Sequence, residues 1–256
     1  MTFHLRKEPQ IVQGILESSD AITCRHLKSA RVRRSEELRL VFQGKVYTCN
    51  LIELGRASFR AKVTACGEVI PREPRLYFAL STLSGTKLSE VVFALSQLAV
   101  DEFWIFGARR SEKSSLQPRL LQRLTEISIR ACEISDLLHL PTLRILTDVH
   151  EVIRQVKGIP GESVRKLLFY EELTERSVPI SAFLRQPYDR SKLLAVIGPE
   201  GGFEEDEVQA FTAAGFELLS LGNIILDSRV AAYYACSALR LWIGGLEDSP
   251  DSPLKG

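Results

Sequence analysis

The sequence has few of the residues and patterns that mark metal sites, disulfide frameworks or membrane anchors. Its five cysteines are odd in number, widely spaced and include no Cys-x-x-Cys pair, which argues against a zinc ribbon or a dithiol redox couple. No apolar run approaches the roughly 18 residues of a membrane helix. The first residues also lack the apolar core of a signal peptide. We therefore expect a reduced, cytoplasmic protein.

The sequence also lacks the glycine-rich motifs that bind nucleotide phosphates. Neither GxGxxG nor GxxxxGK[ST] occurs, which disfavours a nucleotide-dependent oxidoreductase. Histidine is scarce, and His26, His139 and His150 have no partner at metal-ligand spacing. We expect these to be surface or hydrogen-bonded histidines, and we predict no metal site.

Net charge is low as well, at +1, and taken alone it argues against a protein that binds nucleic acid. The average hides an asymmetry, because residues 1–72 contain 13 Lys and Arg against 7 Asp and Glu, whereas the remainder is acidic. Two interpretations of the basic segment stay open: an ordinary solvated surface, or a surface that binds RNA phosphates. The same two apply to the loop with Arg109 and Arg110. The basic segment contains Arg25, Lys28, Arg31, Arg33, Arg34 and Arg39.

Apolar patterning divides the chain in two. Residues 38–63 consist of short apolar runs broken by turn residues, typical of antiparallel strands in a small sheet or barrel. The proline-containing stretch 67–74 reads as a linker. We predict a β-barrel at 1–72 and a second domain at 73–246. The tail at 247–256, with two Ser-Pro pairs, is predicted to be disordered.

Strand-like and helical runs alternate in the second domain, which predicts an α/β fold with a parallel sheet. One long amphipathic helix is expected from Leu120 to Leu138. The last helix, roughly 229–242, is apolar on nearly every side. Such a helix is either sandwiched inside its domain or also packs against a second subunit. The expected strands cover 76–80, 103–106, 143–146, 166–170, 193–197 and 217–221.

The run Gly-Pro-Glu-Gly-Gly at 198–202 carries the strongest chemical signal. It follows an apolar strand and precedes a helix whose first turn holds four acids, at 204–207. Glycines there let a ligand approach the backbone, and ligands of open α/β sheets bind beyond the carboxyl ends of strands. The acids complement a helix N-terminus and would repel a phosphate, so a cofactor without phosphates fits better.

The run IGPEGGF at 197–203, followed by LGNIIL at 221–226, resembles the ribosomal RNA small-subunit methyltransferase E family of the SPOUT superfamily. Weaker similarities are Arg110-Ser111, Ala131 with Glu133, and His26-Leu27. The resemblance implies a PUA-like β-barrel ahead of an α/β domain with a trefoil knot, which binds S-adenosylmethionine and dimerises. We expect Gly201→Val to abolish cofactor binding by steric intrusion and forbidden backbone angles. The cofactor contacts that the resemblance implies are Ile197, Gly198, Pro199, Glu200, Gly201, Gly202, Leu221, Gly222, Ile225 and Leu226.

The function implied by this resemblance is S-adenosylmethionine-dependent methylation of uridine N3 in 16S small-subunit rRNA, by a homodimer. The basic barrel would bind ribosomal RNA while the acidic domain performs the chemistry. The RNA contacts expected are Arg25, Lys28, Arg31, Arg33, Arg34, Arg109 and Arg110.

The sequence departs from the family at charged positions. Where the family reads LGxRILRTETA, this chain has Asp227 for an arginine and Arg229 for the glutamate, so the two charges are exchanged. We expect these two residues at the catalytic centre, although an acid facing a developing anion opposes the chemistry. Three alternatives stay open. Arg229 stabilises the developing anion from its shifted position, the enzyme methylates another group, or the protein is a non-catalytic RNA-binding or ribosome-assembly protein. Other departures are Ser84, Ala94, Gln97, Ile134 and Leu137.

Overall fold

The computed structural model describes residues 1–73, 75–84, 86–111, 118–159, 163–171, 177–189 and 192–244. Its internal contacts divide the chain into two compact units. Unit 1 contains Met1–Pro71 and Cys132–His139, and unit 2 contains Arg72–Ala131 and Leu140–Gly256. Within the described ranges, no helix is long and apolar enough to cross a membrane. The predicted tail at 247–256 lies outside the described residues.

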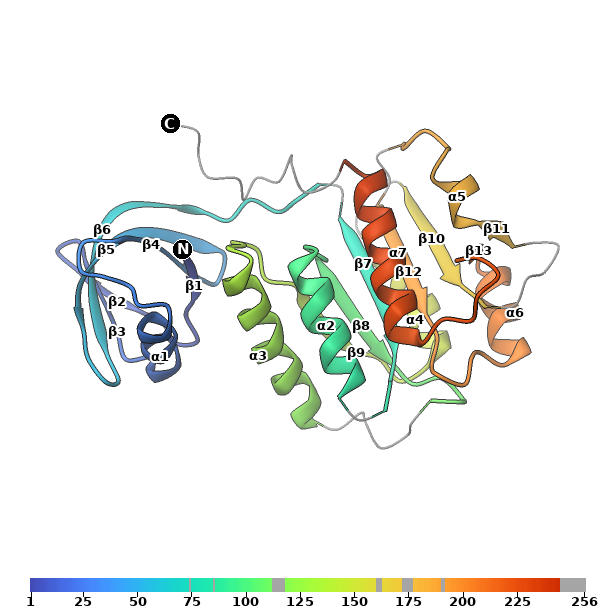
Figure 1. The fold of residues 1–256 in the computed structure, drawn as a ribbon, viewed down its shortest axis with the longest axis horizontal. Coiled ribbons are helices and arrows are strands. Elements are labelled where there is room, and N and C mark those ends of the chain that lie inside the picture. Colours follow the sequence, from blue (N-terminus) through green and yellow to red (C-terminus); the bar gives the residue numbers. More distant parts are fainter. Residues whose placement is uncertain are drawn as a thin grey trace. The chain divides into compact units, whose positions relative to one another are not determined.

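Unit 1 is a curved six-stranded sheet with one helix (Figure 1). The strand order is β1-β4-β5-β6-β3-β2, and every pair is antiparallel except β1 with β4. The elements are β1 (Thr2–His4), β2 (Gln10–Val12), β3 (Ile15–Ser18), α1 (Ala21–Ser29), β4 (Glu37–Phe42), β5 (Lys45–Leu54) and β6 (Phe59–Glu68).

Local chemistry explains the elements of unit 1. A turn at Gln43-Gly44 joins β4 to β5, with φ of 46° and 79° at its two residues. Asp20 begins α1 by accepting hydrogen bonds from the backbone N–H groups of Ile22 and Thr23 at 3.0 and 3.1 Å. The strands at 38–63 are confirmed, whereas β1 and α1 were not predicted. The core shared by the sheet and α1 includes Phe3, Leu16, Leu27, Leu38, Leu40 and Phe59.

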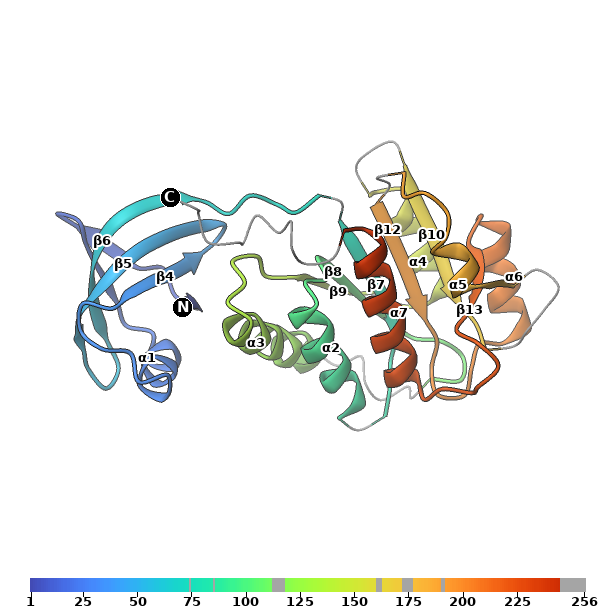
Figure 2. The ribbon, with the colours of Figure 1, turned by 45° about the horizontal axis from the view of Figure 1, so that its top comes forward.

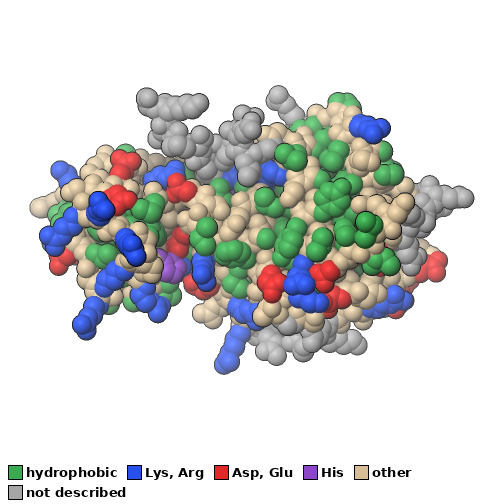
Figure 3. Space-filling model, viewed as in Figure 1, with side chains coloured by type: hydrophobic (Ala, Val, Ile, Leu, Met, Phe, Trp, Pro, Cys, Tyr) green, Lys and Arg blue, Asp and Glu red, His purple; other side chains and the backbone are tan. Residues whose placement is uncertain are grey.

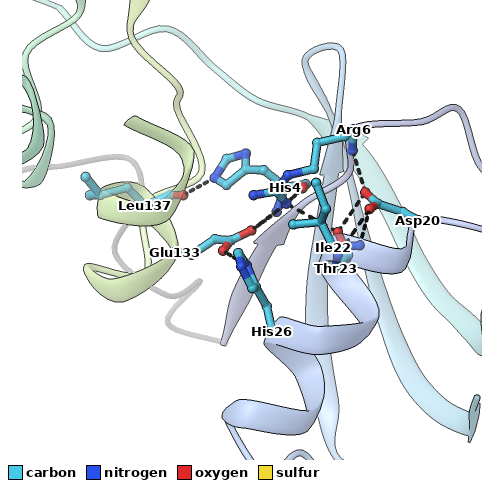
Figure 4. A network of polar contacts seen from close by, with 8 residues as sticks. All are labelled: His4, Arg6, Asp20, Ile22, Thr23, His26, Glu133 and Leu137. Carbon is cyan, nitrogen blue, oxygen red and sulfur yellow. Dashed lines mark hydrogen bonds and ion pairs between the residues drawn. The ribbon is translucent and has the colours of Figure 1, made fainter. Parts of the chain in front are cut away.

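A buried carboxylate organises one side of unit 1 (Figure 4). Glu133, only 8% exposed, accepts hydrogen bonds from the backbone N–H of His4 and from Nη1 of Arg6, both at 3.2 Å. Its other oxygen contacts Nδ1 of His26, from α1, at 2.6 Å. His4 Nε2 also contacts the carbonyl oxygen of Leu137 at 2.9 Å. These contacts attach residues 132–139 to β1 and α1, which is why this segment belongs to unit 1.

Unit 2 is built on a seven-stranded sheet in which every pair is parallel. Its order is β11-β13-β10-β12-β7-β8-β9. The strands are β7 (Leu76–Ser81), β8 (Glu102–Phe106), β9 (Thr142–Ile145), β10 (Val164–Phe169), β11 (Val178–Pro179), β12 (Lys192–Ile197) and β13 (Glu217–Ser220). The predicted α/β fold with a parallel sheet is confirmed, while the trefoil knot stays a prediction.

Helices cover both faces of this sheet (Figures 1 and 2). One apolar core joins the sheet to α2, α5 and α7, with Leu95 and Leu239 among its buried members. A second core joins the opposite face to α4 and α6, through Val152 and Phe211. Side chains of each strand alternate between these cores, which explains the near-continuous apolar runs of the strands. The helices are α2 (Lys87–Gln97), α3 (Pro118–Ile134), α4 (Val149–Val156), α5 (Ile180–Phe183), α6 (Glu205–Ala213) and α7 (Ser228–Trp242).

The prediction for the long amphipathic helix was wrong at its end. The helix stops at Ile134, so Leu138 lies outside it. Asp136 adopts φ of 57°, which ends the regular helix, and the backbone N–H of Leu137 turns back to the carbonyl oxygen of Cys132 at 2.9 Å. Ile134 is 61% exposed and belongs to no core face. The spacing of apolar residues alone could not predict this helix end, because it depends on the left-handed backbone conformation of Asp136.

The Glu133 network predicts an unequal cost for two glutamates of unit 1. Glu133→Ala removes the carboxylate that accepts from Arg6, the His4 N–H and His26, although Arg6 keeps the carbonyl oxygen of His4 as an acceptor at 2.8 Å. We expect a loss of about 2 to 4 kcal/mol in the free energy of unfolding. Glu17→Ala is the matched control, because Glu17 forms an exposed ion pair with Arg60 and should cost less than about 1 kcal/mol. Urea denaturation measures both, and equal losses would contradict the structural role given to Glu133.

Candidate functional site

A pocket lies where three adjacent strands of unit 2 end. The strands β13, β10 and β12 are neighbours, and Phe169 of β10 pairs with Leu219 on one side and Ile197 on the other. The segments that follow these strands therefore leave the sheet at one level. The first turn of α7 completes the wall through Ser228 and Ala231.

Eight of the ten predicted cofactor contacts line this pocket. Gly201 and Gly202 do not, although they lie in the same loop. Six lining residues were not predicted. They lie at the end of β10 or in and after the loop at 221–226, and they approach the glycine loop at 198–202 only in the folded chain. Those predicted are Ile197, Gly198, Pro199, Glu200, Leu221, Gly222, Ile225 and Leu226, and those added are Phe169, Tyr170, Glu171, Ile224, Ser228 and Ala231.

The glycines of the two loops have different structural roles. Gly202 and Gly222 adopt φ of 72° and 124°, which other residues rarely adopt, whereas Gly201 does not. The backbone-angle part of the reason given for Gly201→Val was therefore wrong, whereas the expected loss of cofactor binding stays a prediction. A side chain at Gly201 would meet the Cβ of Arg110 at 3.1 Å, while one at Gly222 has open space within 4 Å. Gly222, which lines the pocket, is the position where backbone conformation matters.

The acids at the start of α6 pair with the two arginines of the 107–111 loop. Arg110 binds both carboxylate oxygens of Glu204, at 2.7 and 3.0 Å, and donates to the carbonyl oxygen of Gly201 at 3.1 Å. Arg109 forms an ion pair with Asp206 at 2.5 Å. The acids thus do more than complement the helix N-terminus. They hold the 107–111 loop beside the glycine loop, and both arginines already have protein partners.

A chain of ion pairs runs along the mouth of the pocket. Lys87, at the start of α2, contacts Glu200 of the glycine loop, and its Nζ lies 3.6 Å from Oδ2 of Asp227. Asp227 caps α7 by accepting the backbone N–H of Arg229 at 2.9 Å and also pairs with its guanidinium at 3.0 Å. Arg229 then reaches Glu90 of α2 at 2.7 Å. The exchanged charges of Asp227 and Arg229 therefore still form an ion pair.

These contacts keep every member of the chain charged. Hydrogen bonding to Lys87 lowers the pKa of Glu200, and hydrogen bonding to Arg229 lowers the pKa of Asp227. Arg229 likewise lowers the pKa of Glu90, and Glu200 raises the pKa of Lys87. The negative charge of Asp227 is balanced by two cations. Sequence reasoning missed Lys87 and Glu90, whose partners are more than 100 residues away.

The predicted RNA contacts of unit 1 lie together on α1 and the loop after it. All five are exposed, and Arg31 has φ of 54°. None of their side chains forms an ion pair with a described residue, in contrast to Arg109 and Arg110. Uncompensated cations of this kind suit the binding of phosphates. The five are Arg25, Lys28, Arg31, Arg33 and Arg34.

One side of α7 exposes large apolar side chains. Val230, Tyr234 and Leu241 recur at helical spacing and are 46%, 47% and 77% exposed. The opposite side of the helix is buried in the core. Figure 3 shows hydrophobic side chains gathered over α7 and its neighbours. Ile224 and Ile225, at the rim of the pocket, are also largely exposed. The helix is therefore not enclosed on all sides by its own domain. Its stripe of Val230, Tyr234 and Leu241 has no partner within the described chain.

Among the described residues, no three His, Cys, Asp or Glu side chains gather in an arrangement suited to a metal ion. His26, one of the isolated histidines, contacts Glu133 in the network described above. His150 lies beside a separate hollow near Asp148.

Relatives of this chain carry a shared name. Ribosomal RNA small subunit methyltransferase E from Mycobacterium bovis is 28% identical over 214 residues, which are 82% of this chain and 79% of the relative. The protein of the same name from Mesomycoplasma hyopneumoniae is 24% identical over 216 residues, covering 83% of this chain and 88% of the relative.

Solved structures agree on the fold. The crystal structure of ribosomal RNA small subunit methyltransferase E from Neisseria gonorrhoeae, bound to S-adenosyl methionine, superposes with a TM-score of 0.75. It is 24% identical and covers 94% of this chain and 96% of that chain. A family model described as an RNA methyltransferase domain matches residues 71–240, more than half of the sequence. The chain therefore belongs to the RNA methyltransferase domain family.

Proposed function

We propose that this protein transfers a methyl group from S-adenosylmethionine to uridine N3 in small-subunit ribosomal RNA. The observation that carries the proposal is the pocket at the carboxyl ends of β13, β10 and β12. Its walls combine apolar side chains with the backbone of two glycine loops, as the walls of cofactor sites commonly do. Relatives named as small-subunit rRNA methyltransferases support the choice of substrate.

The pocket fits S-adenosylmethionine rather than a phosphate-bearing cofactor. Glu171 and Glu200 line it, and acids would repel phosphate. The charge of Glu171 favours a ligand with a positive sulfonium, whereas the charge of Glu200 is balanced by Lys87. Gly222 leaves its backbone open to the pocket, while Phe169, Ile197 and Leu226 supply apolar walls for an adenosine. These residues would bind and orient the cofactor, which supplies the electrophilic methyl group.

The reacting end of the site is proposed at Asp227 and Arg229. Asp227 caps α7 and Arg229 lies in its first turn, beside the lining residues Leu226 and Ser228. For methylation at N3, the N–H proton would pass to solvent, and the uracil ring would carry negative charge until its nitrogen bonds the methyl carbon. A guanidinium nearby would stabilise that charge, which is the role we give to Arg229. Asp227, already balanced by Lys87 and Arg229, opposes the anion less than a free carboxylate would.

We further propose that the basic surface of α1 and its following loop binds the RNA backbone, in the cytoplasm where the free cysteines stay reduced. This assigns phosphate binding to Arg25, Lys28, Arg31, Arg33 and Arg34, whose charges no described acid neutralises. Arg109 and Arg110 remain candidates, although RNA would have to compete with their carboxylate partners.

The decisive experiment is transfer of tritiated methyl groups to small ribosomal subunits isolated from a strain without its own uridine-N3 methyltransferase. We expect incorporation that depends on S-adenosylmethionine, at a single uridine identified by mass spectrometry of nuclease fragments. Subunits already methylated at that position are the control and should accept nothing. Cofactor binding by calorimetry without any incorporation would instead support the non-catalytic RNA-binding protein.

Gly222→Val should weaken binding of S-adenosylmethionine by at least about tenfold, because valine disfavours φ of 124° and its side chain would enter the pocket. Gly14→Val is the matched control. Gly14 also has positive φ, 75°, with open space around it, but it lies in the β2–β3 turn of unit 1. Calorimetry on both variants separates loss of the pocket from general backbone strain. Equal affinities in the two would show that the pocket lies elsewhere.

We also propose a homodimer that covers the exposed stripe of α7. Sedimentation or light scattering should give twice the chain mass, and Tyr234→Glu should give a folded monomer because it places a charge in the middle of the stripe. Val12→Glu serves as a control at an exposed apolar residue of unit 1, which is 65% exposed against 47% for Tyr234. A wild-type protein that stays monomeric at high micromolar concentration would refute the dimer.

A further inference from the structure

One side chain of α2 links the two loops that line the pocket. Lys87 begins α2, far in sequence from both loops, and it follows Thr86, whose hydroxyl donates to Glu90 at 2.8 Å. Its ammonium contacts Glu200 in the loop after β12 and lies 3.6 Å from Asp227 in the loop before α7. Lys87 itself does not line the pocket, whereas both loops do.

The position of Lys87 forces two carboxylates close together. Because a single nitrogen lies within ion-pair distance of both, the carboxylates of Glu200 and Asp227 lie close to each other beside the pocket. Two like charges at such short range repel, and the repulsion is largest where water is partly excluded. Both side chains are only about one third exposed, at 35% and 34%. A cation between the carboxylates offsets this repulsion and therefore favours the observed approach of the two loops.

We propose that Lys87 is a positioning residue for methyl transfer, which holds the loops at 198–202 and 221–228 together so that they close around the cofactor as one wall. This role rests on the proposed function only in that the pocket binds S-adenosylmethionine. Lys87 acts through Glu200 and Asp227 and is not itself assigned a contact with the substrate.

Other charged groups around Lys87 do not replace it. From the α7 side, Arg229 pairs with Asp227, but its remaining contact is to Glu90 of α2 and not to Glu200. From the loop before α2, Ser84 hydrogen-bonds Glu200, yet it carries no charge. Glu90 adds a further negative charge nearby. Lys87 is therefore the cation through which Glu200 is neutralised, consistent with the lowered pKa of that carboxyl.

Lys87→Met keeps the length of the stem and removes the charge, and it should weaken S-adenosylmethionine binding about fivefold near neutral pH. In this variant the pKa of Glu200 rises, because its cation is gone and Asp227 remains. Lowering the pH towards 5 should then protonate Glu200, relieve the repulsion and shrink the defect, whereas wild-type affinity should change less. Calorimetry at several pH values measures the difference.

Two further variants separate charge from packing. Lys87→Arg should restore most of the affinity, and Lys87→Met combined with Glu200→Gln should bind better than Lys87→Met alone, because one of the repelling charges is removed. Lys157→Met is the matched control, since Lys157 is an exposed lysine at the end of α4 away from the pocket. It should leave cofactor affinity unchanged.

A readout without cofactor completes the test. In hydrogen exchange followed by mass spectrometry, Lys87→Met should speed exchange in both loops, including the amide of Gly202, bonded to Pro199, and that of Gly222, bonded to Ser220. Unchanged exchange and affinity would overturn the role of Lys87 while leaving the proposed function intact. Failure of the wild-type chain to bind the cofactor would overturn both. Binding without methyl transfer would overturn the proposed reaction alone.

Discussion

The register of the parallel sheet is the constraint on which the site depends. Ile197, Phe169 and Leu219 pair across β12, β10 and β13, so the three strands end together. Ile197 also pairs with Leu80, which extends the same level to β7. Segments from distant parts of the sequence must therefore turn at a common edge, and the pocket forms between them. A shift of one residue in any strand would turn its apolar side chains to the other core and separate the loops.

Charge pairing then determines how those loops are held. Around the pocket, cations and carboxylates of different elements alternate: Arg110 with Glu204 on one side, Lys87 with Glu200 on the other. Each pair joins a loop to a helix terminus or to another loop. Because the pairs are partly exposed, none contributes much stability alone. Their effect is geometric, since each fixes a loop whose backbone faces the pocket.

The exchange of charges at Asp227 and Arg229 is understandable within this arrangement. A carboxylate suits the position before α7, where it accepts a backbone N–H and begins the helix. Once an acid stands there, Lys87 and Arg229 are both needed to balance it. The summed charge at positions 227 and 229 is the same as in the family, although the first arginine of the family segment is replaced by Ile224. An intact pocket and altered charged positions are therefore compatible.

Whether a feature could be predicted from the sequence depends on how far apart along the chain the interacting residues lie. The strands 193–197 and 166–170, the glycine loop and the last helix depend on local apolar pattern and backbone preference, and they were predicted. The end of the long helix was not, because it depends on Asp136 in a left-handed conformation. The roles of Lys87, Glu133 and Arg110 were missed because each acts on residues about 90 or more positions away.

The low net charge of the chain takes on a different meaning once pairing is considered. In unit 2 the cations nearest the pocket, Lys87, Arg109, Arg110 and Arg229, all have carboxylate partners, so the acidic surplus there surrounds a site suited to a cationic cofactor. In unit 1 the exposed cations of α1 and its loop have no described acidic partner. An anionic polymer would gain free energy by binding the cations of unit 1, because this binding releases counterions. It would gain little by binding the cations of unit 2, because carboxylates already neutralise their charge. Pairing, rather than the count of charges, therefore distinguishes a surface that binds RNA from one that organises a pocket.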